Sequence, residues 1–364
     1  MISQLLEKFI KHIDSFLMTC LFFALMTGLF VLYSASGQDI SRVYAQGVNI
    51  IVALSFMWVA ANIAPHQLER IALPIYVLAV FLLIAVELFG SISHGAQRWL
   101  NLGFTKIQPS EVMRIAMPMM LAWYFSKQES KPMMRNFVIA GLFLFVPVAL
   151  IMKQPDLGTS LLITASGFYV LFLAGLSWRL LVGGVVLFGA SMPILWSMMH
   201  DYQRRRIEIL FDPSQDPLGS GYHTIQAIIA IGSGGAVGKG WLNGTQAQLD
   251  FIPERTTDFI FAVFSEEFGL LGDLLLLGLF TLIIFRGLVI AAQAQSTFGR
   301  LLAGSISLTF FTYAFVNMGM VSGILPVVGV PLPLISYGGT SMVMLCLSLG
   351  ILMSIQTHKK LVAT

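Results

Sequence analysis

The chain has 364 residues, of which 57% are hydrophobic and only 11% are charged. Soluble domains carry about 25% charged residues, so this composition excludes a cytosolic globular enzyme and a disordered protein. The net charge of +3 is too weak to indicate nucleic acid as a partner. The two cysteines, Cys20 and Cys346, lie in apolar runs and form neither a disulfide framework nor a zinc site. The sequence therefore predicts an integral membrane protein.

Ten apolar runs follow one another along the chain, and about 20 residues suffice for one crossing of a bilayer. The first run is longer than a signal-peptide core, so we expect it to be retained. The predicted spans are residues 15–33, 43–63, 71–89, 110–125, 137–152, 158–175, 178–198, 258–285, 301–323 and 340–355. They predict an all-α polytopic membrane protein with about ten transmembrane helices, organised as one domain over residues 1–364.

The basic residues of the short loops indicate the orientation, because Lys and Arg are enriched on the cytoplasmic side. An even number of spans places both termini on one side. That side carries Lys8, Lys11, Arg70, Lys127, Lys131, Arg135, Arg179, Arg286, Arg300, Lys359 and Lys360. The short loops opposite carry only Arg42, Arg98, Lys106 and Lys153. Both termini are therefore predicted to be cytoplasmic, and the long polar loop of about residues 200–257 to be periplasmic.

Polar segments gather on this outer side. They comprise residues 93–108, 153–156, 200–257 and the Pro-rich stretch 324–339. Polar loops displayed on an apolar scaffold are typical of binding and catalytic sites. The outer face is therefore where we look for function.

The fourth span opens with the motif QPSEVMR. Pro109 suits the first helical turn, and Gln108 or Ser110 could cap it. Glu111 and Arg114 are three residues apart on one helix face and could form an ion pair. The pair could be purely structural. Alternatively, Arg114 could bind an anionic group that Glu111 helps to orient, supported by the partial positive charge of the helix N-terminus.

The segment KQPDLGTS repeats this design before the sixth span. Asp156 is a strong N-cap candidate, and capping alone would explain it. Both segments, however, place Gln and Pro before an acidic residue at an outward helix start. We therefore expect Gln154 and Asp156 to share a polar cavity with Gln108 and Glu111.

The long loop contains a basic cluster, a short apolar stretch and a glycine-rich stretch. The cluster Arg204–Arg206 could contact phosphates by bidentate hydrogen bonds, or lie at the membrane interface with its aliphatic stems buried. Residues 223–231 suit a short re-entrant or amphipathic helix. Residues 232–240 are not a phosphate-binding P-loop, because Gly240 stands where Ser or Thr is needed. We expect tight turns and a close backbone approach to a ligand there.

The loop rejoins the membrane through the segment PERTTDF, in which Glu254, Arg255 and Asp258 are charged. Thr256 or Thr257 could cap the following helix, so capping does not require Asp258. An ionisable residue at the start of an apolar span is a functional candidate by default. The six histidines have no zinc-binding spacing. Asp258 is therefore the strongest candidate for a carboxylate base.

Six motifs occur in a fixed order along the chain, namely SASG at 34–37, GAQRW at 95–99, QPSE at 108–111, QPDLGTS at 154–160, PERTTDF at 253–259 and GVPLPLISYGGTS at 329–341. They resemble the motifs of the SEDS family (shape, elongation, division and sporulation), essentially from end to end. The short tails and the residues SGQD at 36–39 favour the cell-elongation branch over the division branch.

The resemblance implies a peptidoglycan glycosyltransferase that polymerises lipid II at the periplasmic face of the bacterial inner membrane, for cell elongation and rod shape. It implies a class B penicillin-binding protein as the transpeptidase partner, together with other elongation-complex membrane proteins. By its place in the motif, Asp258 corresponds to the family's essential aspartate. Arg114 stands where the family usually has Lys, and Thr256 where it usually has His. Arg keeps the positive charge of Lys but not its point-charge geometry.

The implied chemistry needs one base, since a pyrophosphate leaves without protonation once its charge is neutralised, whereas a glycosidase needs two carboxylates. Asp258 is the predicted base. A divalent cation, Mg²⁺ or Mn²⁺, could assist, and no organic cofactor is expected. The candidate substrate- or pyrophosphate-binding residues are Gln108, Glu111, Arg114, Gln154, Asp156, Arg98, Trp99, Arg205, Glu254 and Ser336.

Two other classes of function fit a ten-helix membrane protein. A lipid II flippase would place its ionisable residues near the bilayer midplane, whereas here they lie at outward helix starts. A non-catalytic scaffold for a penicillin-binding protein would leave the polar outer face unexplained. The sequence therefore favours the enzyme.

Overall fold

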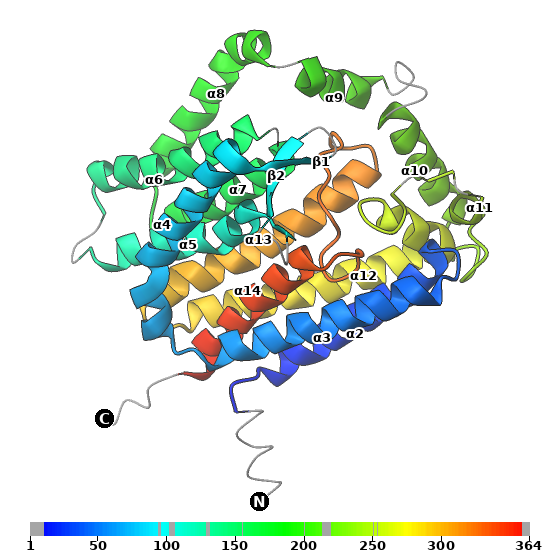
Figure 1. Ribbon diagram of the computed structural model, residues 1–364, viewed down its shortest axis with the longest axis horizontal. Coiled ribbons are helices and arrows are strands. Elements are labelled where there is room, and N and C mark those ends of the chain that lie inside the picture. The colour runs from blue at the N-terminus through cyan, green and yellow to red at the C-terminus, as the bar shows by residue number, and fades with distance from the viewer. Residues whose placement is uncertain are drawn as a thin grey trace, which may run out of the picture.

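The computed structural model describes residues 11–93, 96–101, 106–128, 132–154, 156–199, 201–212, 220–249, 251–252 and 254–358. Long helices, packed side by side, make up most of it (Figure 1). The predicted all-α membrane fold is confirmed. Ten helices correspond one to one to the ten predicted spans, and their ends differ from the predicted ones by seven residues or fewer. They are α2 (Ser15–Ala35), α3 (Ile40–Asn62), α4 (Pro65–Phe89), α5 (Pro109–Ser126), α6 (Met134–Lys153), α7 (Leu157–Leu173), α8 (Trp178–Met198), α12 (Ile260–Ala292), α13 (Thr297–Val321) and α14 (Thr340–Thr357).

Seven of these helices are long and apolar enough to cross a membrane over the described residues, namely α2, α3, α4, α6, α12, α13 and α14. The helix α7 and the first part of α8 are shorter apolar segments. The remaining helix, α5, begins with the charged pair Glu111 and Arg114, which lowers its hydropathy. Large apolar side chains such as Phe81 and Leu275 are exposed on the outer helices, as expected for surfaces that face lipid.

A small antiparallel sheet stands where only a polar loop was predicted. Its strands are β1 (Ser91–Ser93), β2 (Ala96–Asn101) and β3 (Lys106–Ile107), and β2 is the middle strand. Antiparallel strands joined by short turns need few residues to pair, and such short strands give little signal in the hydrophobic pattern. The strand β2 packs against α4 and α5, so the sheet covers the start of α5.

The long loop is largely helical and lies over the part of the bundle that is away from the chain termini (Figure 1). It contains α9 (Asp201–Phe211), α10 (Ser220–Gly234) and α11 (Thr245–Gln248). The short helix predicted at residues 223–231 is part of α10, which packs against α12 and α13. Residues 213–219, between α9 and α10, lie outside the described residues.

The helix α12 is interrupted at Gly269, whose φ of 62° and ψ of −166° are not helical. The backbone of the preceding glycine-rich stretch pairs with both sides of this break, through hydrogen bonds from Lys239 to Glu266, Gly240 to Glu267, Leu270 to Gly235 and Leu271 to Ala236, all between 2.9 and 3.0 Å. A Cβ on Gly238 would lie 2.1 Å from the carbonyl oxygen of Glu267. The glycines therefore allow a close backbone approach to α12, because a broken helix leaves backbone groups that need partners. Their approach to a ligand stays a prediction.

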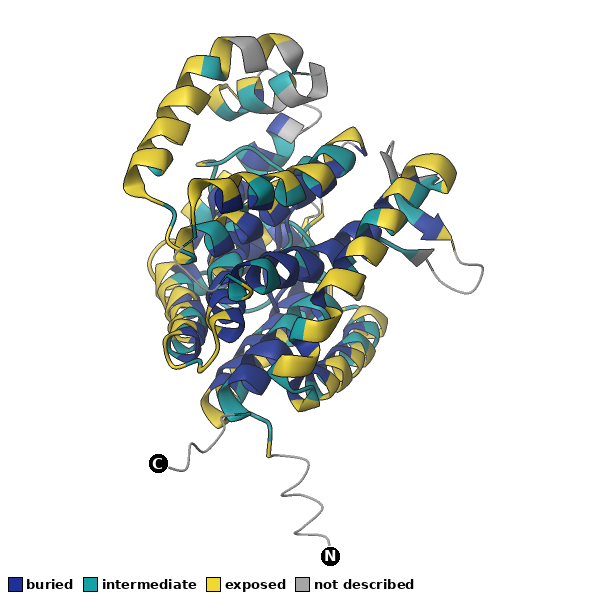
Figure 2. Cartoon of the chain, turned by 90° about the vertical axis from the view of Figure 1, so that its left-hand side faces the viewer, coloured by how far each residue is buried: buried dark blue, intermediate teal, exposed yellow. Residues whose placement is uncertain are grey.

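The two ends of the described chain lie at the same end of the bundle (Figure 1). The imidazoles of His12 and His358 are stacked with their centroids 4.0 Å apart, and His12 Nδ1 lies 3.2 Å from Thr357 Oγ1. Figure 2 shows the buried residues gathered along the middle of the bundle and the exposed ones on its outer helices. The central helix is α13, which packs against α5, α7, α12 and α14.

Candidate active site

The starts of α5 and α7 lie against each other. Asp156 is the N-cap of α7, where its carboxylate accepts hydrogen bonds from the backbone N–H and the hydroxyl of Thr159. Gln108 occupies the N-cap position of α5 but makes no side-chain cap hydrogen bond. Its amide Nε2 donates instead to Asp156 Oδ2 at 3.1 Å. The structure thus brings the two Gln-Pro-acid segments into direct contact, 48 residues apart in sequence.

Glu111 and Arg114 form a buried ion pair. Arg114 Nη1 donates to Glu111 Oε2 at 2.8 Å, and the side chains are only 12% and 7% exposed for Arg114 and Glu111 respectively. Arg114 Nη2 reaches Thr159 Oγ1 at 3.3 Å, and the guanidinium lies over the ring of Tyr313, 5.4 Å from its centroid. The ion pair therefore belongs to the same polar cluster as Asp156. Because the ion pair is buried, few water molecules screen the positive charge of Arg114. Its electrostatic interaction with a nearby anionic group would therefore be strong.

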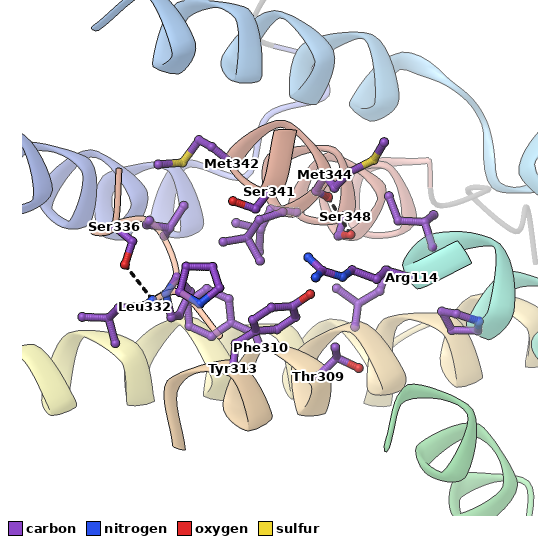
Figure 3. Close-up of a pocket in the computed structure, with 18 residues that line it drawn as sticks. Arg114, Thr309, Phe310, Tyr313, Leu332, Ser336, Ser341, Met342, Met344 and Ser348 are labelled. Carbon is purple, nitrogen blue, oxygen red and sulfur yellow. Dashed lines mark hydrogen bonds between the residues drawn. The ribbon is translucent and has the colours of Figure 1, made fainter. Parts of the chain in front are cut away.

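A cavity opens beside this pair, between α5, α13, α14 and the segment that precedes α14 (Figure 3). Arg114 and Tyr313 line one part of it, and the view shows both pointing into it together with Ser348. Arg114 Nε and the hydroxyl of Thr309, which also lines the cavity, are buried without a hydrogen-bond partner. Buried polar atoms of this kind commonly form their hydrogen bonds with water or a ligand. Neither Arg205 nor Asp258 lines this cavity.

Two predicted binding residues near Asp156 have structural contacts. Arg98 Nε lies 3.8 Å from Asp156 Oδ2 and 3.4 Å from the carbonyl oxygen of Gln154. The Gln154 side chain is buried and donates to the carbonyl oxygen of Leu83 in α4 at 3.1 Å. Gln154 therefore ties the end of α6 to α4, while the half-buried Trp99 lies on the strand next to them.

The segment that carries Asp258 forms turns before α12 begins at Ile260. The N-cap residue of α12 is Phe259, which provides no side-chain hydrogen bond. The predicted capping by Thr256 or Thr257 is therefore wrong. The hydroxyl of Thr257 instead donates to Glu254 Oε2 at 2.8 Å, within the turn. Since no side chain caps the helix, other parts of the protein must hold this segment.

Those contacts come from the motif GVPLPLISYGGTS at 329–341, which precedes and enters α14 and is called the signature motif from here on. The backbone N–H of Tyr337 donates to the carbonyl oxygen of Thr256 at 2.9 Å. The hydroxyl of Ser336 donates to the carbonyl oxygen of Thr257 at 2.6 Å and accepts from the N–H of Leu332. Ser336 was predicted to bind substrate, but its hydroxyl is engaged in this backbone clamp. The same stretch, from Pro331 to Ser336, also lines the Arg114 cavity, so one segment contacts both parts of the site.

The half-buried Asp258 is close to this motif as well. Its Oδ2 lies 3.5 Å from the position that a Cβ on Gly329 would occupy, and Gly329 has a positive φ of 73°. A larger residue there would be strained and would crowd the carboxylate. The glycine of the signature motif therefore leaves room beside Asp258.

Among the described residues, the charged ones next to Asp258 and those that follow the seventh span do not line the Arg114 cavity. Glu254 is exposed and has a positive φ of 50°, and Arg255 donates to the carbonyl oxygen of Ala247. In the basic cluster, Arg204 donates to the carbonyl oxygens of Trp196 and Ser197 at the end of α8. Arg205 is exposed on α9, and the side chain of Arg206 falls outside the described part. The structure therefore does not bring this cluster into the Arg114 cavity.

A second buried charge, Glu266, was assigned no role from the sequence. Its carboxylate is completely buried, pairs with Lys239 Nζ at 2.7 Å and accepts the backbone N–H of Gln246 at 3.0 Å. It thereby anchors the loop before Asp258 to α12. A polar residue inside an apolar span was the available signal, but the partners 20 to 27 residues away were not visible from it.

The sequence profile of the cell cycle protein family of FtsW, RodA and SpoVE matches residues 14–361. The chain belongs to this family. The SEDS membership predicted from the motifs is thereby confirmed. The chain is 54% identical over 353 residues to the peptidoglycan glycosyltransferase MrdB of Escherichia coli K12, covering 97% of this chain and 95% of that protein. It is 38% identical to the MrdB of Helicobacter pylori, covering 84% and 81% respectively.

Solved structures of family members have the same fold. A chain of a peptidoglycan synthase complex, described for its structural coordination of polymerization and crosslinking, superposes with a TM-score of 0.84 at 29% identity, covering 94% of this chain and 97% of that chain. The rod shape determining protein RodA of Thermus thermophilus superposes with a TM-score of 0.71 at 27% identity, covering 94% and 96%. These likenesses extend over nearly the whole chain.

Proposed function

We propose that this SEDS protein polymerises lipid II, the undecaprenyl-pyrophosphate-linked disaccharide pentapeptide, with Asp258 as its catalytic base. The chain is a peptidoglycan glycosyltransferase of the cell-elongation type. The observation that carries this conclusion is the 54% identity to MrdB of Escherichia coli over nearly the full length of both proteins. The residue roles are our own inference from the geometry.

The reaction is a single displacement at the anomeric carbon of the donor sugar. The 4-hydroxyl of the acceptor GlcNAc attacks the anomeric carbon of the donor MurNAc, the bond to undecaprenyl pyrophosphate breaks, and the α-linked donor becomes a β-linked product. Asp258 takes the proton of the attacking hydroxyl, as a positioned general base does. The turn that carries Asp258 is held by the signature motif, which supports this assignment.

Arg114 is the proposed partner of the leaving pyrophosphate. Its guanidinium lines a cavity, has an unpartnered Nε and is oriented by Glu111. A preorganised cation in a poorly hydrated site stabilises charge that develops on a leaving group. Arg98, Gln108 and Asp156 extend the polar cluster toward the outer end of α5 and α7. Arg205 and Glu254, which are exposed, are proposed to contact the substrate from the loop.

A divalent cation is a further proposal. Over the described residues, no group of three or more His, Cys, Asp or Glu side chains converges to hold a metal ion. Mg²⁺ is commonly bound by one or two carboxylates together with substrate phosphates. Such a cation would therefore depend on the pyrophosphate of lipid II for much of its coordination.

The experiment is lipid II polymerisation by the purified protein in complex with its transpeptidase, with the transpeptidase blocked. We expect glycan polymer to form, and EDTA to slow it if a divalent cation takes part. A complex that binds or translocates lipid II but forms no polymer would support the flippase, and one that does neither would support the scaffold.

The chain is a multi-pass protein of the inner membrane. We propose that its partner is a class B penicillin-binding protein, because the solved complex with the same fold couples polymerization to crosslinking, and that other elongation-complex membrane proteins join them. We further propose that both termini are cytoplasmic. The adjacency of His12 and His358 at one end of the bundle supports an even number of spans, and the excess of basic residues indicates which side this is.

Cysteine labelling tests the orientation. The native Cys20 and Cys346 are buried, so their background labelling should be low. We expect an impermeant thiol reagent to label Glu208→Cys, on the exposed surface of α9, in intact spheroplasts. Thr297→Cys, at the exposed start of α13, should react only after the membrane is opened. The reverse pattern would invert the proposed topology.

A further inference from the structure

Asn317 is a polar residue in the middle of the site that the proposed mechanism has not used. It lies on α13 and is completely buried. Burying an amide costs free energy unless its hydrogen-bonding groups find partners. A primary amide inside an apolar membrane helix therefore needs a specific reason to be there.

The partners of Asn317 supply that reason. Its Nδ2 donates to the carbonyl oxygen of Asp258 at 2.8 Å and to the carbonyl oxygen of Val330 at 2.7 Å. Since a carbonyl oxygen can only accept, the amide must present its NH₂ group to both. The side chain thus joins the Asp258 turn to the signature motif that lines the Arg114 cavity.

The acceptor side of the same amide is unsatisfied. Asn317 Oδ1 is buried without a hydrogen-bond partner. A buried oxygen left unpaired is costly, and such exceptions call for an explanation. An apolar side chain of similar volume would remove this unpaired oxygen but would leave the carbonyl oxygens of Asp258 and Val330 without their donor. The two donor bonds are therefore what the amide contributes.

We propose that Asn317 is a positioning residue for glycosyl transfer, which holds the backbone of Asp258 and through it the direction of the carboxylate. The inference rests on the proposed role of Asp258 as the base. Ser336 and Tyr337 hold the carbonyl groups of Thr257 and Thr256, and Asn317 holds the next one. No side chain caps α12. These three tertiary hydrogen bonds therefore hold the Asp258 turn in place of a local capping hydrogen bond.

Two variants of similar volume test the proposal in the purified complex. Asn317→Leu removes both donors, and Asn317→Asp retains at most one. We expect turnover at saturating lipid II to fall about 10- to 100-fold in Asn317→Leu, because misplacement of a reacting group by about 1 Å costs up to about 100-fold. The KM for lipid II should change less than about twofold, since Asn317 contacts the base segment and not the substrate.

Ser305→Ala is the matched control. Ser305 lies on the same helix, is completely buried and donates to the carbonyl oxygen of Ser166 at 2.7 Å. The substitution therefore removes a comparable buried hydrogen bond that does not touch the Asp258 turn. Its turnover should stay close to that of the unmodified protein.

A double variant separates positioning from an independent role. If Asn317 acts through Asp258, Asp258→Asn combined with Asn317→Leu should be no slower than Asp258→Asn alone, because residues that act as a unit are not additive. If the double variant is slower than Asp258→Asn by the full factor that Asn317→Leu loses alone, the two residues act independently and the proposal is overturned.

The remaining outcomes are equally decisive. A well-inserted Asn317→Leu protein with normal turnover, beside an inactive Asp258→Asn, would overturn the role of Asn317 and leave the base unaffected. Full activity of Asp258→Asn would remove the base and this inference with it. Loss of both Asn317 variants from the membrane, with Ser305→Ala retained, would make Asn317 a purely structural amide and overturn the proposal.

Discussion

We expect Asp258→Asn to reduce lipid II polymerisation by at least about 100-fold, the low end of what a general base contributes. The amide has the size and shape of the carboxylate but cannot take the proton of the attacking hydroxyl. Membrane levels and binding of the transpeptidase should stay near normal, because the clamp on this turn uses backbone carbonyl groups. The measurement is the product ladder against time for the purified complex.

Asp258→Glu should be nearly as slow, because one extra methylene displaces the base by about 1 Å. Glu254→Gln is the comparison within the same turn, since Glu254 is exposed and is proposed only to contact the substrate. Its loss of charge should reduce polymerisation far less than Asp258→Asn does. Glu266→Gln is not an equivalent control, because it removes the partner of Lys239 from a completely buried position. An Asp258→Asn complex that polymerises at more than about half the normal rate would contradict the assignment and make Glu254 or Asp156 the next candidate base.

The second large effect is expected for Arg114→Ala, which should slow polymerisation by about 100-fold because it removes a cation that stabilises the charge developing on the leaving group. Arg114→Lys should retain most of the activity, because Lys keeps the cation and can still pair with Glu111. It cannot reproduce the contact of Nη2 with Thr159 or the stacking over Tyr313, so some loss is expected. The readout is the initial rate of polymer formation.

A single truncation at Arg114 cannot by itself separate function from folding. Removing one member of a buried ion pair leaves the other charge uncompensated, at a cost of about 3–5 kcal/mol. The double variant Glu111→Gln with Arg114→Met removes both charges at nearly constant volume and should be close to neutral for stability. We expect this double variant to insert normally and to be inactive. If it inserts and retains normal polymerisation, the pair is a structural ion pair and Arg114 does not bind the pyrophosphate.

The sequence by itself determined the long apolar helices and the family. Length and hydropathy are properties of continuous segments, so the ten predicted runs correspond to ten helices with shifts only at their ends. The six motifs are also continuous, and the match over residues 14–361 agrees with them. The helix starts that carry Gln, Pro and an acidic residue are continuous segments too, so they could be recognised in the sequence. Asp156 is the N-cap of α7, as predicted.

The tertiary structure alone decided how these segments meet. Asn317 is 59 residues from Asp258 in sequence, and Gln108 is 48 residues from Asp156. No local pattern specifies hydrogen bonds across such separations. The same is true of the glycine-rich stretch, whose partner is a break in α12, and of Ser336, whose hydroxyl holds the backbone of Thr257. Local propensity predicted a capped helix after Thr257, but tertiary hydrogen bonds hold the turn instead, because backbone groups in a membrane protein must find partners within the protein.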